Sequence, residues 1–333
     1  MTMGDPSGVG PELCIRLLER LKKNSPPLLI IGDYQILKAA LEKFGAKNAR
    51  AWFSSGQIFS RLPPEQPAAR LAILDLSRLD PKKIFARRGS KEHGLASWKY
   101  IEAAVKLCQS KTCSGIVTLP VNKDAMMKAG CPFPGHTDLL ASLDNTDHAV
   151  MLMVLGNLRV ALLTHHIPLR DVPKQIETRK ILPILKLMNQ SLKIDFGIPS
   201  PKIGVLGLNP HAGEAGKIGD EEIRRIRPAI ASARKLGINA SGPHPADTVF
   251  HRALNHEFDA LLAMYHDQGI GPLKTLDFER VVNITLGLSF VRTSPGHGTA
   301  YDIAWRGRAS EQSLLQAFEL AGRLVQNRKR NNG

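Results

Sequence analysis

One stretch carries most of the information about the fold: Ile203-Gly204-Val205-Leu206-Gly207-Leu208-Asn209-Pro210-His211. Its apolar part, residues 203–208, has the length and the branched side chains of a strand that is buried on both faces. Buried strands of this kind occur in sheets that helices cover on both sides. Because helical and strand patterns alternate along the rest of the chain, we predict an α/β fold, with His211 just beyond the end of one strand.

Two further apolar runs end in the same way. Residues 160–164 are followed by two adjacent histidines, and residues 260–264 are followed by Tyr265 and His266. Ligands of open α/β sheets bind beyond the carboxyl ends of the strands, so the histidines meet at one place if these strands are neighbours. Three protein ligands leave coordination positions open for a substrate, and neutral imidazole suits Zn, Co, Ni or Fe. The sequence therefore predicts a catalytic metal site.

The spacing leaves two points open at this site. Alternate residues of a strand face opposite ways, so either His165 or His166 points toward the others, but not both. Asp267 follows His266 directly and could either bond the second nitrogen of that ligand or accept a proton. The structural alternative is that each histidine only caps a strand end or completes a loop.

Periodicity predicts the other elements of the chain. A hairpin is expected where two apolar runs, 151–155 and 158–163, flank Gly156 and Asn157. No internal repeat or low-complexity linker separates two halves of the sequence, so we expect two lobes that interleave along it. Helices are expected over residues 11–23, 36–44, 92–109, 139–143, 221–236 and 312–325, and short buried strands over residues 28–31 and 115–119.

The beginning of the chain is unusual for an α/β protein. The loop Gly4-Asp5-Pro6-Ser7-Gly8-Val9-Gly10 leads directly into a helix, as such loops do after a first strand. Almost nothing precedes the loop in this sequence. We therefore expect either that the first strand is absent or that the chain as written begins late.

Composition narrows the class of protein. The 333 residues are 43% hydrophobic and 23% charged, and we recognise neither a membrane-spanning run nor a signal peptide. Four cysteines without Cys-x-x-Cys spacing indicate reduced thiols in the cytoplasm. The net charge of +15 would suit nucleic acid, anionic membranes or anionic substrates. The basic residues are scattered, however, and no zinc-finger or RNA-binding signature accompanies them.

The chain lacks the signatures of the common nucleotide-binding loops, Gly-x-Gly-x-x-Gly and Gly-Lys-Ser/Thr. Other residues could bind a phosphate or a carboxylate. Lys274, Asn283 and Arg292 combine a point charge, an amide donor and a guanidinium fork. His136 and Thr137 open a helix and could donate to an anion at its start, although they could also merely cap it.

Seven motifs follow one another over nearly the whole chain: GDPSGVGPE (4–12), PGHT (134–137), HIPLRDV (166–172), LNPHAGE (208–214), PADT (245–248), MYHDQG (264–269) and VNITLGL (282–288). In this order they resemble the PdxA family of 4-hydroxythreonine-4-phosphate dehydrogenases of vitamin B6 synthesis. The resemblance implies the oxidation of 4-phosphooxy-L-threonine by NAD and its decarboxylation to 3-amino-2-oxopropyl phosphate, on the route to pyridoxal 5′-phosphate. An alternative within the family is a dehydrogenase of D-threonate or D-erythronate 4-phosphate.

The same resemblance implies roles for single residues. The family's ligands for a divalent metal, taken as Zn, Mg or Co, fall on His166, His211 and His266, which selects His166 over His165. The family is a homodimer with its site in an interdomain cleft near the subunit interface. Asp247 is our candidate for a catalytic residue that one subunit contributes to the other. The family's substrate contacts fall on His136, Thr137, Lys274, Asn283 and Arg292.

A second, independent resemblance concerns the coenzyme. The motif GHGTAYDIA (296–304) is similar to the adenine-side loop of isopropylmalate and isocitrate dehydrogenases, whose two-lobed fold binds NAD without a Rossmann glycine motif. An acidic side chain accepts hydrogen bonds from ribose hydroxyls and repels a 2′-phosphate, so Asp302 favours NAD over NADP. The implied lobes are residues 1–134 with 285–333 on the nucleotide side, and residues 135–284 for metal, substrate and dimerisation. The candidate coenzyme residues are His297, Gly298, Ala300 and Asp302.

Three assignments stay open at this point. The general base is either Asp267 or a lysine, for which Lys274 is the candidate. Asp138 and Pro295-Gly296 depart from the family pattern, and these changes leave the choice among the phosphorylated hydroxy acids undecided. In a different class, the basic charge would suit a nucleic-acid-binding protein on an inactive scaffold, which predicts steeply salt-dependent binding.

Overall fold

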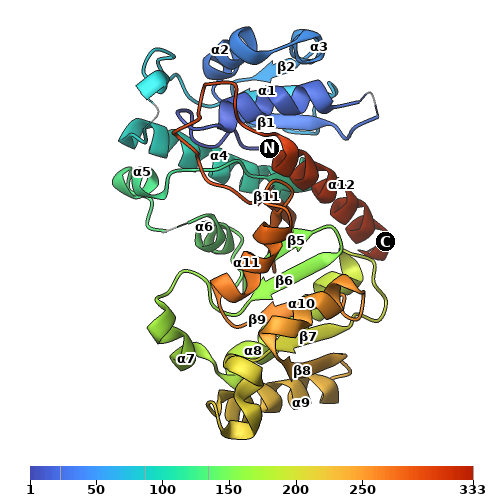
Figure 1. Ribbon diagram of the computed structural model, residues 1–333. Helices are drawn as coiled ribbons and strands as arrows, with labels where there is room; N and C mark the ends of the chain where they lie inside the picture. Colours follow the sequence, from blue (N-terminus) through green and yellow to red (C-terminus); the bar gives the residue numbers. More distant parts are fainter. Residues whose placement is uncertain (23, 87, 134, 333) are drawn as a thin grey trace. The chain divides into compact units, whose positions relative to one another are not determined.

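The computed structural model describes residues 1–22, 24–86, 88–133 and 135–332. The chain forms two compact units, the first made of Met1–Asp147 and Leu288–Gly322, the second of His148–Gly287 and Arg323–Gly333 (Figure 1). Lys23, at the expected end of a helix, and Pro134, at the expected edge of a lobe, lie outside the described residues. The separate functions expected for the two lobes stay a prediction.

The first unit is built around parallel strands. In one sheet β3 pairs in parallel with β1 on one side and with β2 on the other, and β11 pairs in parallel with β4. Its strands are β1 Leu28–Gly32, β2 Gln57–Phe59, β3 Leu71–Asp75, β4 Gly115–Val117 and β11 Val291–Pro295. Its helices are α1 Gly10–Arg20, α2 Tyr34–Phe44, α3 Lys47–Ser54, α4 Lys91–Gln109, α5 Lys123–Lys128 and α6 His136–Leu143, with a 3-10 turn at Ile84–Ala86.

The position of the first strand is filled by the residues around Thr2. Thr2 forms parallel bridges with Ile31 in β1 and with Thr118 directly after β4. The backbone N–H of Thr2 donates to the carbonyl of Val117 at 3.0 Å, and that of Met3 donates to Ile31 at 2.8 Å. Of the two alternatives given above, the absence of the first strand is wrong, because a short extended segment pairs with Ile31 of β1 and with Thr118 after β4 and leads into the loop before α1.

The second unit contains a mixed sheet in the order β10-β5-β6-β9-β7-β8. β5 runs antiparallel to both β10 and β6, whereas β6, β9, β7 and β8 are parallel to one another. Its strands are β5 Val150–Leu155, β6 Leu158–Leu162, β7 Ile203–Leu206, β8 Ala240–His244, β9 Ala260–Ala263 and β10 Val282–Leu286. Its helices are α7 Val172–Gln175, α8 Thr178–Ile194, α9 Arg227–Lys235, α10 Ala246–Leu254 and α11 His266–Leu276, with shorter turns at Leu169–Asp171, Pro210–Gly216 and Glu222–Ile226.

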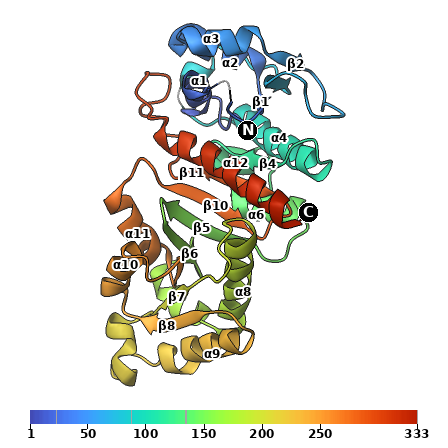
Figure 2. The same cartoon turned by 90° about the vertical axis from the view of Figure 1, so that its right-hand side faces the viewer.

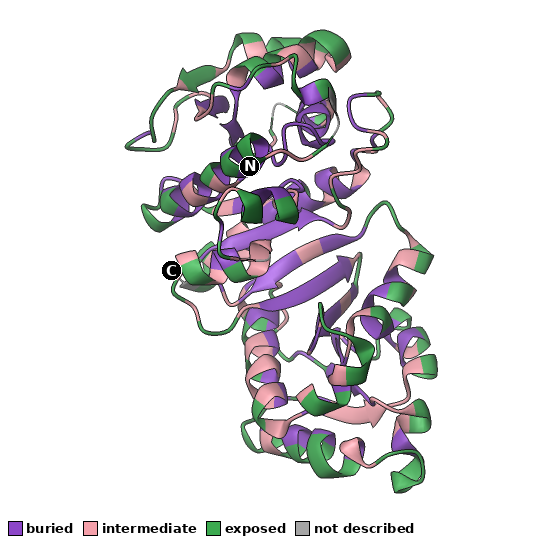
Figure 3. Cartoon of the chain, turned by 90° about the vertical axis from the view of Figure 1, so that its left-hand side faces the viewer, coloured by how far each residue is buried: buried purple, intermediate pink, exposed green. Residues whose placement is uncertain are grey.

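Helices cover both faces of this second sheet, with α10 and α11 on one face and α8 on the other (Figure 2). Most residues of β5, β6, β7, β9 and β10 are buried, whereas β8 is mostly half-buried and the outward surfaces of the helices are exposed (Figure 3). One hydrophobic cluster joins side chains of α10 and α11 to alternate residues of the strands, for example Leu273 of α11 to Val160 and Leu162 of β6. The expected α/β fold is confirmed, and so is the hairpin at Gly156, whose φ of 57° suits a tight turn.

The helix expected over residues 221–236 is confirmed as a continuous helical stretch over residues 221–235. Its first part, Glu222–Ile226, is π-helical and runs directly into α9, and Pro228 has no N–H with which to continue an α-helical pattern there. The last helix, α12 Gln312–Asn332, continues past the expected end at residue 325. Its final turns are held within the second unit, where Arg328 forms an ion pair with Asp195 at 2.7 Å and the Asn331 amide donates to the carbonyl of Ile194.

Candidate active site

The three strands that precede the predicted metal ligands are neighbours. β6 pairs with β9, with Leu162 opposite Ala263, and β9 pairs with β7, with Ala260 opposite Ile203. Because all three strands are parallel, their carboxyl ends lie at the same edge of the sheet. The structural condition on which the predicted site depended is therefore met within the second unit.

Two of the three predicted ligands lie close together. The ring centroids of His166 and His266 are 6.0 Å apart, and His165 lies edge-on to His166 at 4.9 Å. Nδ1 of His266 is 2.7 Å from Oδ1 of Asp267. Of the two roles considered for Asp267, the structure shows this bond to the ring, which leaves Nε2 of His266 as the atom available to a ligand.

His211 lies on an unusual backbone segment, Pro210–Gly216, just beyond β7. Residues 211–215 all have positive φ, between 42° and 79°, so the chain makes a left-handed turn there. Across the described part of the chain, no three His, Cys, Asp or Glu side chains are grouped closely enough to hold a metal ion. The three-histidine site thus stays a prediction, supported by adjacent strand ends and by the approach of two rings.

The remaining candidates of the second unit occupy two helices and a strand. Lys274 is half-buried on α11, the helix that begins at His266, and its Nζ lies 5.0 Å from the centre of the Phe278 ring. Asn283 is in β10, and its side-chain oxygen is buried without a hydrogen-bond partner. Asp247 is exposed in the first turn of α10. A buried amide oxygen without a donor indicates a ligand-binding position at Asn283.

In the first unit, Arg292 is a buried cation on β11. Both Nε and Nη2 of its guanidinium donate to the hydroxyl oxygen of Thr118, at 3.1 and 2.6 Å. Burial lowers the pKa of Arg292 to about 9. Removing a guanidinium from water is unfavourable, so its presence inside a protein indicates a function in binding an anion.

His136 and Thr137 are the first two residues of α6, as expected for a helix start. Nε2 of His136 is buried and has no hydrogen-bond partner. Burial, together with the positive charges of Arg292 and Lys123, holds the pKa of His136 well below its usual value. Lys123 was not recognised from the sequence, although it begins α5 directly after the capping residue Asn122. The group of Lys123, His136 and Arg292 has the chemistry of an anion-binding site.

The state of His136 predicts how the stability of the protein depends on pH. The folded protein keeps this imidazole neutral, whereas the unfolded chain takes up a proton below the ordinary pKa of 6.5. The unfolded state then binds more protons, so the free energy of unfolding decreases as the pH falls below about 6.5. We expect the Tm to drop between pH 7 and pH 5, and to drop less in His136→Gln.

The control for this measurement is His251→Gln, which changes an exposed histidine of α10. Burial and the nearby Arg252 also lower the pKa of His244 in the second unit. The acid sensitivity is therefore expected to be reduced in His136→Gln and not abolished. The same Tm decrease in wild type and in His136→Gln would contradict the assignment.

The predicted coenzyme residues lie on a loop that is fastened to the glycine-rich segment before α1. The backbone N–H of Val9 donates to the carbonyl of Thr299 at 3.0 Å, and the Tyr301 hydroxyl donates to Asp5 at 2.7 Å. Burial raises the pKa of Asp5. Of the four candidate coenzyme residues, Gly298 and Asp302 are exposed. Nδ1 of His297 lies 3.0 Å from the carbonyl oxygen of Gly298. The backbone of Ala300 has a φ of 46°, in the left-handed region.

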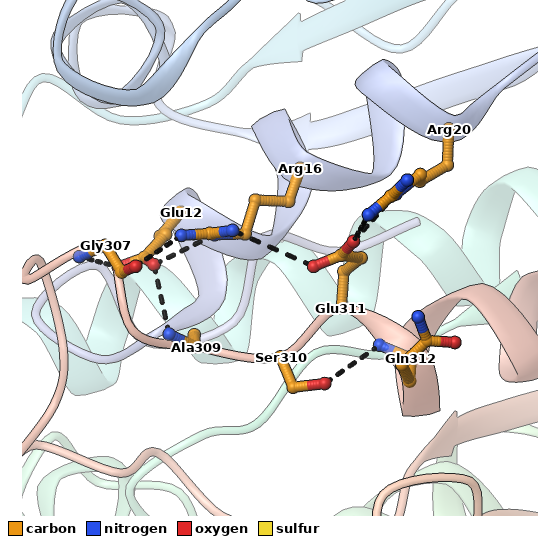
Figure 4. A network of polar contacts seen from close by, with 8 residues as sticks. All are labelled: Glu12, Arg16, Arg20, Gly307, Ala309, Ser310, Glu311 and Gln312. Atoms are coloured by element: carbon orange, nitrogen blue, oxygen red, sulfur yellow. Dashed lines mark hydrogen bonds and ion pairs between the residues drawn. The ribbon is translucent and has the colours of Figure 1, made fainter.

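The segment after this loop is held by two buried carboxylates, those of Glu12 and Glu311 (Figure 4). Glu12 of α1 accepts hydrogen bonds from the backbone N–H groups of Gly307 and Ala309 and from the side chain of Arg16. Glu311 forms ion pairs with Arg16 and Arg20 of the same helix. The motif at residues 4–12, which the sequence alone left without a role, thus contacts the loop at residues 296–304 through Asp5 and Val9, and the segment after that loop through Glu12.

Comparison with known proteins agrees with these observations. The family model of the pyridoxal phosphate biosynthetic protein PdxA matches residues 23–321. The chain belongs to the PdxA family. A 4-hydroxythreonine-4-phosphate dehydrogenase of Desulforapulum autotrophicum is 42% identical to it over 329 residues, which are 96% of this chain and 93% of that protein. The PdxA family resemblance seen in the motifs is thus confirmed.

Two further relatives illustrate the structural similarity to this chain and the different activities for which family members are named. A crystal structure of 4-hydroxythreonine-4-phosphate dehydrogenase from Klebsiella pneumoniae matches with a TM-score of 0.86 and 37% identity, covering 98% of this chain and 97% of that one. A protein of Oceanobacillus iheyensis, named for a proposed D-threonate 4-phosphate dehydrogenase activity, is 40% identical over 324 residues, 96% of each chain. Both names are those of dehydrogenases.

Membership of the PdxA family confirms the expected enzyme class, an oxidoreductase that acts on a CH–OH group, and its connection with pyridoxal phosphate biosynthesis. Oxidation of this kind requires a hydride acceptor, which dehydrogenases commonly take as a nicotinamide coenzyme. Among the described residues, no helix has the length and apolar character needed to cross a membrane. The individual site residues stay predictions.

Proposed function

We propose that the chain is a metal- and NAD-dependent 4-hydroxythreonine-4-phosphate dehydrogenase. It oxidises 4-phosphooxy-L-threonine and releases CO₂ to give 3-amino-2-oxopropyl phosphate. The observation that carries this proposal is the row of three adjacent strand ends with His166, His211 and His266, in a chain of which 96% aligns with a relative of that name.

Among the divalent metals expected here, Zn, Mg and Co, the donor set of these strand ends fits Zn and Co best, because imidazole nitrogens suit these ions and Mg prefers oxygen ligands. A carboxylate on the second nitrogen, as Asp267 provides for His266 at 2.7 Å, is typical of metal-bound histidines. His166, His211 and His266 would hold the ion. When bound, it would supply a Lewis acid that lowers the pKa of the substrate hydroxyl.

Other residues of the chain bind and orient the substrate. Arg292 and His136 of the first unit, with Thr137, have the donors that a phosphate or carboxylate requires. Lys274 and Asn283 of the second unit offer an ammonium and an amide. Binding groups remote from the reacting carbon accelerate the reaction because they fix its position. The proton of the substrate hydroxyl is taken by Asp267, through the oxygen not bonded to His266, or by Lys274.

The coenzyme is NAD, bound along the loop with His297, Gly298, Ala300 and Asp302. The exposed carboxylate of Asp302 can accept hydrogen bonds from ribose hydroxyls, and it repels the 2′-phosphate of NADP. The active protein is a cytoplasmic homodimer. Asp247, which is exposed at the start of α10, is the residue that each subunit contributes to the other.

A second candidate function is the oxidation of D-threonate or D-erythronate 4-phosphate. It is favoured by the Oceanobacillus iheyensis relative, which is 40% identical over 324 residues. The departures from the family pattern at Asp138 and at Pro295-Gly296 leave the choice between the substrates open. These acids carry the same phosphate and an adjacent hydroxyl, so the same residues would bind them.

Steady-state turnover distinguishes the two substrates. We expect kcat/KM with NAD to be at least about 100-fold higher for 4-phosphooxy-L-threonine than for D-threonate 4-phosphate, because a buried site that pairs with one polar group rejects an analogue that leaves a partner unpaired. NADH formation at 340 nm measures the rate, and NADP replaces NAD in a parallel series. The expected preference is for NAD.

Two other results would contradict the proposed function. Faster oxidation of D-threonate 4-phosphate would assign the chain to the second function. Absence of turnover with 4-phosphooxy-L-threonine and with both D-threonate and D-erythronate 4-phosphate, together with nucleic-acid binding that weakens steeply with salt, would identify a binding protein on an inactive scaffold.

A further inference from the structure

Glu222 is a buried carboxylate directly behind the segment that carries His211. Glu222 is only 1% exposed. Oε1 accepts hydrogen bonds from the backbone N–H groups of Leu208 and Asn209, at 2.8 and 2.7 Å. Oε2 accepts from the side-chain amide of Asn209 at 3.0 Å. Glu222 thus holds the two residues that lead into Pro210 and His211.

The backbone that follows requires such support. Residues 211–215 have φ values from 42° to 79°, and four of the five carry a Cβ. L-amino acids disfavour this left-handed region because the Cβ crowds the backbone, and a run of such residues persists only where its surroundings hold it. The hydrogen bonds from Leu208 and Asn209 to Glu222 fix the start of the left-handed turn.

Glycines let the turn lie directly against the carboxylate. A Cβ on Gly213 would lie 2.6 Å from Oε2 of Glu222, and a Cβ on Gly207 would lie 3.1 Å from Oε1. The distance of 2.6 Å at Gly213 is shorter than the closest approach that a Cβ atom normally makes to another atom. The turn therefore encloses the Glu222 carboxylate on the side of Gly207 and on the side of Gly213.

A second side chain ties this segment to the neighbouring strand end. Gln268 of α11 is 9% exposed. Its amide nitrogen donates to the carbonyl of Gly207, and its oxygen accepts from the backbone N–H of Met264, both at 2.7 Å. Gly207 leads toward His211 and Met264 leads to His266. The two predicted ligands therefore extend from backbone segments that Gln268 holds together.

We propose that Glu222 is a positioning residue that holds the left-handed turn and so presents the His211 imidazole at the edge of the sheet beside His266. This inference rests on the proposed role of His211 as a metal ligand. Glu222 does not itself take part in the chemistry. The carboxylate is needed because both of its oxygens accept hydrogen bonds from N–H donors. A glutamine in its place would put an NH₂ group, which can only donate, where one of these oxygens accepts.

The test compares the full-length variants Glu222→Gln and Glu221→Gln. The control residue Glu221 also accepts the Asn209 amide, at 2.8 Å, but is only half-buried. We expect the affinity for Zn²⁺, measured by competition with a chelator, to fall about 10- to 100-fold in Glu222→Gln. In Glu221→Gln it is expected to change less than about 3-fold, the size of a surface effect.

Hydrogen exchange supplies a readout that does not depend on the metal. In Glu222→Gln, amide exchange is expected to accelerate over residues 208–218 and to stay unchanged in α4 of the first unit. A second variant, Gly213→Ala, places a methyl group against the Glu222 carboxylate and strains a position with a φ of 79°. It is expected to lower Zn²⁺ affinity and protection in the same segment.

The outcomes separate this inference from the proposed function. If Glu222→Gln and Gly213→Ala fold, retain wild-type Zn²⁺ affinity and show wild-type exchange over residues 208–218, Glu222 has no positioning role. If wild type and His211→Ala bind Zn²⁺ equally well, His211 is not a ligand, and the proposed metal site is rejected together with this inference. The Zn²⁺ affinity of His211→Ala distinguishes the two failures, because it is reduced in the first and equal to that of wild type in the second.

Discussion

His211→Ala is expected to lower kcat/KM for 4-phosphooxy-L-threonine by at least about 1000-fold, because a catalytic metal contributes several kcal/mol to the stabilisation of negative charge in the transition state. His211 is one of only three predicted protein ligands, and the other two, His166 and His266, have ring centroids 6.0 Å apart. Two imidazoles alone would hold a divalent ion weakly. The loss of the third ligand is therefore expected to remove both the metal and the activity.

Metal analysis and turnover measure this prediction together. Wild type, His211→Ala and His251→Ala are dialysed against a chelator, reloaded with Zn²⁺, Mg²⁺ or Co²⁺, and assayed with NAD. His251 is an exposed histidine of α10 in the same unit, and its replacement is expected to leave metal content and rate unchanged. A His211→Ala variant that keeps both metal and activity would overturn the metal site.

Arg292→Met is expected to lower kcat/KM by about 100- to 1000-fold, the usual effect of removing one partner of a buried charged hydrogen bond to a ligand. The guanidinium is buried on β11 with two of its nitrogens on the Thr118 hydroxyl. Burial has already removed most of its water, so a phosphate that reaches it forms strong bonds. Methionine has a similar length and no charge, so the packing of the site is largely kept.

Kinetics with Arg292→Lys and Arg159→Met complete this experiment. Lysine restores the charge but not the planar fork, so Arg292→Lys is expected to recover only part of the loss. Arg159 is a half-buried arginine of β6 that bonds the carbonyl of Asp259 and lies over the ring of Phe196. Its replacement tests for general destabilisation. If Arg292→Met and Arg159→Met reduce kcat/KM equally, Arg292 has no specific role in substrate binding.

Hydrogen bonds from polar side chains link the chain segments that lie just beyond the ends of β6, β9 and β7. The Thr164 hydroxyl donates to the carbonyl of Met264 at 2.8 Å, and Gln268 joins Met264 to Gly207. Backbone groups at strand ends must find partners when they are buried, and these side chains provide them. The same bonds tie together the segments that lead to the predicted ligands His166, His266 and His211.

Local sequence patterns were sufficient for much of the fold and for part of the site. The apolar runs at residues 160–164, 203–208 and 260–264 became buried strands of one sheet, and Gly156-Asn157 became the turn of a hairpin. Such elements depend on side chains within about ten positions, so their periodicity is visible in the sequence. The residues assigned through the PdxA resemblance follow from the sequence alone, and their roles stay predictions.

Contacts between distant segments decided the rest. The position of β9 between β6 and β7 follows from pairing between segments that are far apart in the sequence, such as Val160 with Leu261 and Ile203 with Ala260. The sequence by itself could state this neighbourhood only as a condition. The helix expected over residues 221–236 begins with a π-helical turn, which places Glu222 behind Asn209. No local pattern marks a glutamate as buried, because charged residues are normally exposed. The partners of Glu222, and the left-handed turn around it, exist only once the second unit has folded.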